Sequence, residues 1–271
     1  MCRLYGFRSN ARRKVECELI HAQNSLLSQS QHDERGGSNP HGWGLGTYDG
    51  IAPTVVREPV AAFDSDEFRW ESARIYTCNT LAHVRRATVG IIREENTHPF
   101  MHGSWLFAHN GNLGAFSEIR DLLIDEMTSA HREAVLGDTD SEHFFHWVLS
   151  RAESEPEASL IHVLGRAVEQ IRDWSQAARP GAEVALNTIL TNGTESVGTR
   201  FGRSLWYLER PLVHACEICD GALHVEEGMT SPYRAVVIAS ERVTETEEWT
   251  AMPDGTVFHV DRDLNLHLTA M

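Results

Sequence analysis

The order of the predicted secondary-structure elements limits the fold of this chain more than any other sequence feature. Strand-like alternation of apolar and polar residues occupies the first part of the chain and returns in its last third, with helical spacing concentrated between them. The chain has no regular alternation of strands and helices and no internal repeat. This order favours a layered α+β fold with antiparallel sheets. Because no segment resembles a linker, we expect residues 1–271 to form a single domain.

Local patterns give the expected positions of the elements. The glycines of the segment 42–46 suggest close approach of another backbone. Asp64 or Ser65 is the expected cap of one helix, and Asp138 or Thr139 of another. The expected helices are 15–28, 64–75, 116–127, 143–151 and 158–177, and the expected strands are 2–7, 41–48, 54–57, 80–88, 104–113, 183–191, 204–209, 234–240 and 256–261.

Composition indicates an ordinary globular protein of the cytoplasm. Hydrophobic residues make up 41% and charged residues 23% of the chain, and no stretch approaches the roughly 18 apolar residues of a membrane span. The N-terminus lacks the basic start and apolar run of a signal peptide. A net charge of −15 argues against a broad surface for nucleic acid or anionic membranes, although one local arginine suffices for a small anionic substrate.

The first two residues, Met1-Cys2, are the candidate catalytic centre. Removal of the initiator methionine would leave one residue with a thiol and a free α-amine, whose pKa of about 7.7–8.0 suits it to act as a base toward the thiol. A small residue chosen only for its place after the start codon is the alternative, because a lone cysteine is a weak signal.

The other cysteines and the histidines do not indicate a metal centre. Cys216 and Cys219 form a C-x-x-C pair, but no second pair completes a zinc site, so a structural or incidental role is favoured. His143 and His146 have helical spacing and lack an evident third ligand nearby, which favours packing or surface placement. We therefore expect neither a metal nor an organic cofactor.

Five segments together carry most of the chemical information. Singly, the Asn110-Gly111 pair is typical of a hairpin turn, and a lone arginine, aspartate or histidine is more often an ion-pair partner, a helix cap or a structural histidine. The segments are Met1-Cys2, His83-Val84-Arg85-Arg86-Ala87-Thr88, Asn96-Thr97-His98-Pro99-Phe100, His109-Asn110-Gly111 and Thr139-Asp140-Ser141-Glu142. In this order they resemble the class II glutamine amidotransferases, and most of all their stand-alone members, which include hydrolases of γ-glutamyl compounds in ergothioneine synthesis and glutathione breakdown. Two further segments also fit the stand-alone members: His41-Gly42-Trp43-Gly44 and Val237-Ile238-Ala239-Ser240-Glu241.

The resemblance implies a fold and a reaction. The fold is a four-layer αββα sandwich of two antiparallel sheets, that of the N-terminal nucleophile hydrolases, and it agrees with the order of the predicted elements. In the reaction, the Cys2 thiolate would attack the γ-amide of glutamine or of a γ-glutamyl compound and form a γ-glutamyl thioester. Ammonia or an amine would leave, and water would hydrolyse the thioester. The Asn110 side chain and the Gly111 backbone N–H would bind the oxyanion.

The resemblance also implies how the substrate is held. Arg85 would grip its α-carboxylate, because a guanidinium fork matches a planar carboxylate, and Asp140 would bind its α-ammonium. Thr88 and His98 belong to the segments that form the pocket in the family. Two neighbours depart from the family pattern: Arg86 stands where several members carry an aromatic residue, and Val89 where some carry histidine.

Three functions remain open at this point. A stand-alone γ-glutamyl hydrolase is favoured, because no synthase domain is fused to the segments above. A glutaminase subunit that delivers ammonia to a separate synthase is the second, and a catalytically silent binding or regulatory protein of the same fold is the third. Retention of Met1 would favour the third function, since the α-amine would then be an amide nitrogen. The natural substrate and the oligomeric state stay open.

Overall fold

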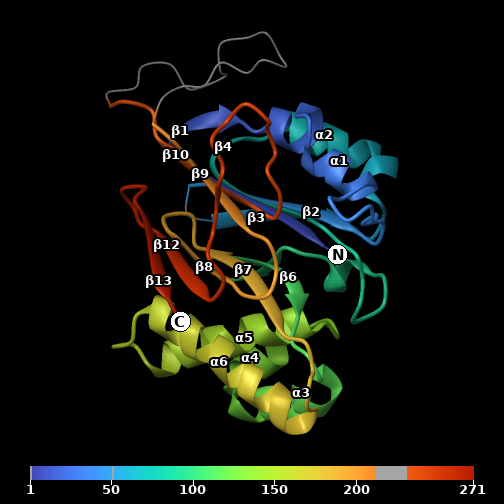
Figure 1. The fold of residues 1–271 in the computed structure, drawn as a ribbon, viewed down its shortest axis with the longest axis vertical. Coiled ribbons are helices and arrows are strands. Elements are labelled where there is room, and N and C mark those ends of the chain that lie inside the picture. The colour runs from blue at the N-terminus through green and yellow to red at the C-terminus, as the bar shows by residue number, and fades with distance from the viewer. Residues whose placement is uncertain (1, 51, 212–230) are drawn as a thin grey trace.

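The computed structural model describes residues 2–50, 52–211 and 231–271. Its two sheets lie face to face, with helices on both outer sides (Figure 1). All strand pairings among the described residues are antiparallel. The α+β class and the four-layer αββα arrangement are therefore confirmed. Met1, Cys216 and Cys219 lie outside the described residues.

The first sheet has seven strands in the order β11-β9-β10-β1-β4-β2-β3. Strand β1 lies between β10 and β4, so the N-terminal segment is held on both sides. It begins as expected but runs on to Lys14. The strands are β1 (Arg3–Lys14), β2 (Trp43–Asp49), β3 (Ala52–Glu58), β4 (Tyr76–Val84), β9 (Trp206–Arg210), β10 (Ala235–Ala239) and β11 (Thr250–Ala251).

The second sheet has six strands in the order β13-β12-β8-β7-β6-β5. The sequence pattern missed β5, β8 and β13, which are three to five residues long, because such short strands form only when a neighbouring strand supplies hydrogen-bond partners. The strands are β5 (Phe100–His102), β6 (Trp105–Asn112), β7 (Ala185–Thr191), β8 (Ser196–Arg200), β12 (Thr256–Val260) and β13 (Leu266–Ala270).

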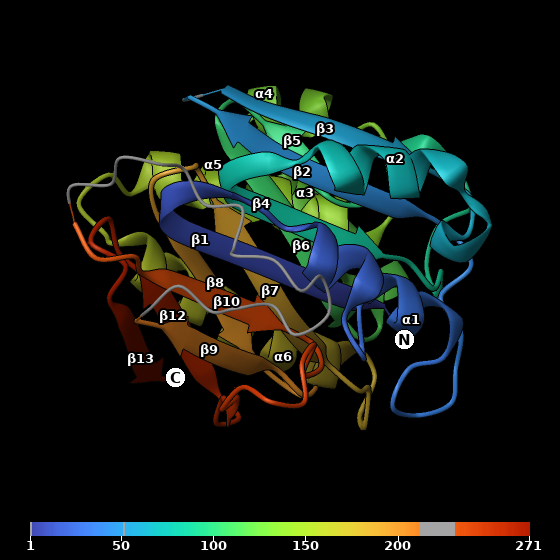
Figure 2. The ribbon, with the colours of Figure 1, turned by 90° about the horizontal axis from the view of Figure 1, so that it is seen from above.

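The helices form the two outer layers. Helices α1 and α2 cover the seven-stranded sheet, and α3 to α6 cover the six-stranded sheet (Figures 1 and 2). Of the expected caps, Ser65 accepts the Phe68 amide and Thr139 accepts the Glu142 amide. None of the helices in the described part of the chain is long and apolar enough to cross a bilayer. The helices are α1 (Leu26–Gln31), α2 (Asp66–Arg74), α3 (Phe116–Glu126), α4 (Ser129–Ala134), α5 (Asp140–Ser154) and α6 (Leu160–Ala178).

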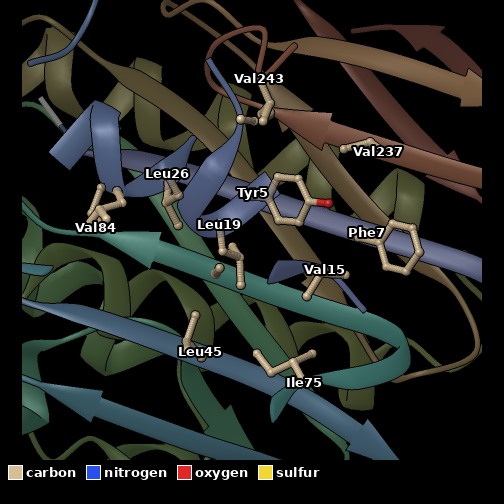
Figure 3. Close-up of a cluster of buried hydrophobic side chains, with 14 of the residues drawn as sticks. Tyr5, Phe7, Val15, Leu19, Leu26, Leu45, Ile75, Val84, Val237 and Val243 are labelled. Carbon is tan, nitrogen blue, oxygen red and sulfur yellow. The ribbon is translucent and has the colours of Figure 1, made fainter. Parts of the chain in front are cut away.

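Three apolar cores separate the four layers. One lies between the seven-stranded sheet and α1 and α2, one between the six-stranded sheet and α3, α5 and α6, and one between the sheets. Alternate residues of β1 serve two of them: Tyr5 and Phe7 face the helices (Figure 3), and Leu4 faces the other sheet. A strand buried on both faces has little freedom to shift, because a one-residue slip would exchange its two faces.

One expectation about local structure is wrong. The segment 15–28 is not one helix: a π-helical turn over Cys17–His21 precedes α1, which starts only at Leu26. The expected strand 104–113 is confirmed as β6 and contains His109-Asn110-Gly111, so the alternative of a hairpin turn is wrong: pairing with β7 overrides the local turn preference. The expectation for the glycines of β2 is confirmed, since a Cβ on Gly44 would lie 2.1 Å from the His98 carbonyl oxygen.

Candidate active site

A cavity of about 420 Å³ lies beside the start of β1. Five of the seven residues predicted to form the site contribute to its wall, and the buried Arg85 and His98 do not. Among the lining residues, Cys2 and Asp140 are the only ones of metal-ligating type. The wall consists of Cys2, Arg86, Thr88, Val89, Asn110, Gly111, Asn112, Gly114, Ala115, Phe116, Ser117, Asp140, Arg179 and Arg203.

Backbone and side-chain contacts hold Cys2 at the cavity. Its Sγ lies 3.2 Å from the Arg86 amide nitrogen and 3.5 Å from the Arg86 carbonyl oxygen. The Arg3 guanidinium donates to the Cys2 carbonyl at 2.9 Å. Arg3 is buried and paired with Asp33 at 3.1 Å and with Glu241. The start of β1 is therefore anchored by an ion-pair network that sequence reasoning missed.

The surroundings of the thiol act on its pKa in opposite directions. Burial raises the pKa of the Cys2 thiol, while the Arg86 amide and the charges of Arg85 and Arg3 oppose that rise. The net direction is upward, so the thiol is largely protonated at neutral pH. A thiol in this state needs a base to become a nucleophile.

Asn110 and Gly111 reach the cavity from the end of β6. The Asn110 side-chain amide donates to the Ser240 hydroxyl at 3.2 Å, and that hydroxyl accepts the Leu4 amide at 3.0 Å. This contact uses one of the two amide protons and leaves the second available. A Cβ at Gly111 would lie 1.8 Å from the Ala185 carbonyl oxygen, so only glycine fits here.

Asp140 stands in the first turn of α5 and is almost fully buried. One carboxylate oxygen accepts the Leu113 amide at 3.0 Å, and the other accepts the Ser141 amide at 2.8 Å. The Ser141 hydroxyl in turn lies 2.8 Å from Nδ1 of His109. The carboxylate is thus fixed in direction beside the cavity, where it can receive a cationic group.

Arg85 supports the cavity wall from behind. Its guanidinium donates to the backbone carbonyls of Ile91 at 3.2 Å and Val89 at 3.0 Å. Thr88 and Val89 of the same segment line the cavity. The side chain therefore holds the segment that forms one wall, and its charge lies close enough to Cys2 to act on the thiol.

His98 does not line the cavity and lies in a buried pair of histidine rings. Its ring centroid lies 4.2 Å from that of His83, and neither of its nitrogens has a hydrogen-bond partner among the described residues. Burial lowers the pKa of His98 well below its ordinary value and lowers that of His83 to about 3. Both rings are therefore neutral in the folded protein at neutral pH.

The histidine pair predicts a loss of stability in mild acid. The unfolded chain gains protons below the ordinary pKa of 6.5, which the folded His83 does not. The free energy of unfolding should fall as pH drops from 6.5 toward 3, by up to about 1.4 kcal/mol per pH unit for each histidine. Urea denaturation at several pH values measures this slope. The variant His83→Gln keeps a donor for the His109 carbonyl. Because one fewer proton is taken up on unfolding, its slope of unfolding free energy against pH should be smaller by about 1.4 kcal/mol per pH unit. An unchanged slope would contradict the assignment.

Three arginines give the cavity a basic wall, and the sequence pointed only to Arg86 among them. Arg179 and Arg203 come from the later part of the chain. Arg203 is the less exposed of these two, with 14% of its side chain exposed against 56% for Arg179. Each pairs with a partly or largely exposed glutamate, Glu183 and Glu118 respectively. Arg86 joins them from the segment after β4. Neither late arginine stands in a recognisable motif, so only folding brings them to the site.

The sequence of this chain also matches a known family. Residues 1–270 match the family model described as glutamine amidotransferases class-II. The chain belongs to the class II glutamine amidotransferases. The family consists of amidotransferases and γ-glutamyl hydrolases, which are enzymes.

Relatives and solved structures agree over nearly the whole chain. A probable glutamine amidotransferase of Saccharomyces cerevisiae, DUG3, is 26% identical over 97% of this chain and 82% of its own length. The γ-glutamyl-hercynylcysteine sulfoxide hydrolase of Mycobacterium tuberculosis is 26% identical over 100% of this chain and 97% of its own. The crystal structure of a predicted glutamine amidotransferase from Pseudomonas aeruginosa superposes with a TM-score of 0.64 at 24% identity, covering 100% of both chains. The likeness to stand-alone members of the family is thereby confirmed.

Proposed function

We propose that this chain, acting as one domain over residues 1–271, hydrolyses the γ-amide bond of a γ-glutamyl compound with Cys2 as the nucleophile. The observation that carries the proposal is that Cys2, Asn110, Gly111 and Asp140 line one cavity. A nucleophile, two oxyanion donors and an anionic anchor are the parts that such a reaction requires.

The reaction begins once Met1 has been removed and Cys2 has a free α-amine. That amine takes the thiol proton, and Sγ attacks the γ-carbonyl carbon. Asn110 Nδ2 and the Gly111 N–H donate to the oxyanion of the tetrahedral intermediate. The carbon–nitrogen bond then breaks, the proton passes to the leaving amine, and a γ-glutamyl thioester remains. Water adds to the thioester and releases glutamate and the Cys2 thiol.

Two charges recognise the glutamyl end of the substrate. Asp140 binds the α-ammonium, consistent with its fixed carboxylate at the cavity. Arg85 binds the α-carboxylate. To do so, its guanidinium releases the backbone carbonyls of Val89 and Ile91 and donates to the substrate carboxylate instead. Thr88 contributes to the pocket from the wall, whereas His98 is buried and does not line the cavity.

The cavity favours a leaving amine that is larger than ammonia and carries a negative charge. Its volume of about 420 Å³ falls in the range of about 300–1,000 Å³ that drug-sized ligands occupy, more than glutamine fills. Besides the two residues that recognise the glutamyl end, its wall carries Arg86, Arg179 and Arg203. The Mycobacterium tuberculosis relative carries the name of a γ-glutamyl compound hydrolase. We therefore place γ-glutamyl amines that bear a carboxylate ahead of glutamine.

A substrate panel tests this function. Protein with a processed N-terminus is given glutamine, a γ-glutamyl dipeptide with a free carboxylate and the same dipeptide as its amide, and release of glutamate is measured. We expect the highest kcat/KM for the free carboxylate. Hydrolysis of glutamine that appears only with a separate synthase would contradict this proposal and support the ammonia-delivering alternative. No turnover and no covalent labelling would support the silent protein.

Arg203→Gln should separate acidic from neutral leaving groups. Because a charge-assisted hydrogen bond contributes about 1.5–3 kcal/mol, kcat/KM for the dipeptide with a free carboxylate should fall about 10- to 100-fold. The value for glutamine should change little. Arg200→Gln is the matched control, since Arg200 pairs with Asp254 and does not line the cavity. Equal losses of kcat/KM on both substrates in Arg203→Gln would show that the residue does not bind the carboxylate of the leaving amine.

A further inference from the structure

Three histidines from different elements meet outside the catalytic cavity. His102 ends β5, His131 belongs to α4 and His146 to α5. One ring nitrogen of each lies within 4.8 Å of the other two. His131 and His146 are buried, and His102 is partly exposed, so the cluster has an edge toward solvent. The sequence pairs His146 with His143, but its neighbours here come from two other elements.

The spacing of the nitrogens suits a divalent ion. The Nδ1 atoms of His131 and His146 lie 3.1 Å apart. Tetrahedral zinc with bonds of about 2.0–2.1 Å separates neighbouring ligand nitrogens by about 3.3 Å. A small movement of the partly exposed His102 would complete a three-nitrogen face. Imidazole is a preferred ligand of zinc, and a three-histidine site leaves a fourth position for water.

The surroundings of His131 match those of a metal ligand. Its other nitrogen, Nε2, lies 3.1 Å from the Glu153 carboxylate. Metal-bound histidines commonly donate this second N–H to a carboxylate, which fixes the tautomer and leaves the ligating nitrogen unprotonated. With Nε2 protonated, the Nδ1 lone pair of His131 points toward His146. Without a metal, the 3.1 Å contact is an N–H···N hydrogen bond, and a metal ion would take the place of that proton.

We propose that His102, His131 and His146 bind one zinc ion, with the Glu153 carboxylate orienting His131 through its Nε2 atom. His102 pairs with Trp105 at the tip of the β5–β6 hairpin. The ion would join this tip to α4 and α5. Asn110 lies near the other end of β6, so this site is separate from the cavity. Bound zinc would stabilise the fold by linking three elements, independently of the proposed reaction.

Zinc titration of metal-stripped full-length protein tests the proposal. We expect one equivalent to bind, and the thermal midpoint of unfolding to rise with zinc concentration. His102→Gln should weaken binding by at least about 100-fold, and Glu153→Gln by about 10- to 100-fold. His267→Gln is the matched control, because His267 also contacts a carboxylate, Asp261, but is exposed and outside the cluster. All variants keep every cysteine, so zinc held by thiols cancels in the comparison.

A second readout identifies the ligands directly. Cobalt in place of zinc should give the visible absorption of a four-coordinate ion, without a thiolate charge-transfer band, and His102→Gln should lose it. Circular dichroism of the stripped variants should match wild type, which separates metal loss from misfolding. Equal zinc affinity of wild type and His102→Gln, or no zinc uptake by folded wild type, would overturn the proposal.

Discussion

Replacement of Cys2 by alanine is expected to lower kcat for γ-glutamyl hydrolysis by at least about 10⁴-fold, because the only nucleophile of the proposed mechanism is removed. The free energy of unfolding should change little, since the side chain is partly exposed and the hydrogen bonds of its Sγ within the described residues go to the backbone of Arg86. Initial rates of glutamate release and a thermal unfolding curve measure the two effects. Cys78→Ala is the matched control, because Cys78 lies in β4 and not in the cavity wall.

Covalent labelling and intact mass add the chemical identity of the nucleophile. An electrophilic glutamine analogue should label wild type and Cys78→Ala once, and label that persists in Cys2→Ala would refute the assignment. The labelled fraction should equal the fraction that has lost Met1, because an acylated nitrogen cannot act as the base. Activity of protein that retains Met1 would refute the role of the α-amine.

Asn110→Ala should lower kcat by about 10²- to 10³-fold, which corresponds to about 2.7–4 kcal/mol of transition-state stabilisation. KM should change much less, since the oxyanion develops only as the thioester forms and breaks. Steady-state kinetics on the best substrate of the panel separates the two constants.

A second asparagine provides the control for this variant. Asn79 is a buried strand residue whose amide donates to the Thr191 hydroxyl at 3.0 Å, away from the cavity. Asn79→Ala should cost stability and leave kcat unchanged. Equal losses of kcat in both variants would mean that Asn110 acts through stability and not through the oxyanion.

Local hydrogen bonding explains which elements the sequence revealed. Ser65 and Thr139 cap helices that begin within one residue of them, so their signals need no distant partner. The turn preference of Asn110-Gly111 failed for the opposite reason, since seven residue pairs between β6 and β7 outweigh it. Helix α4 was missed because six residues without a strong amphipathic pattern carry too little local signal.

The sequence by itself determined the family, because the motifs that contain Cys2, Asn110, Gly111 and Asp140 stand in an informative order along the chain. The reaction type is proposed from the same motifs. Only the tertiary structure decided what surrounds them. It brought Arg203 to the cavity wall, set Arg85 behind that wall, buried His98 outside the cavity lining, and joined three histidines of β5, α4 and α5. The physical reason is that a motif records chemistry at one place in the chain, whereas cavity charge and metal geometry depend on packing between elements far apart in sequence.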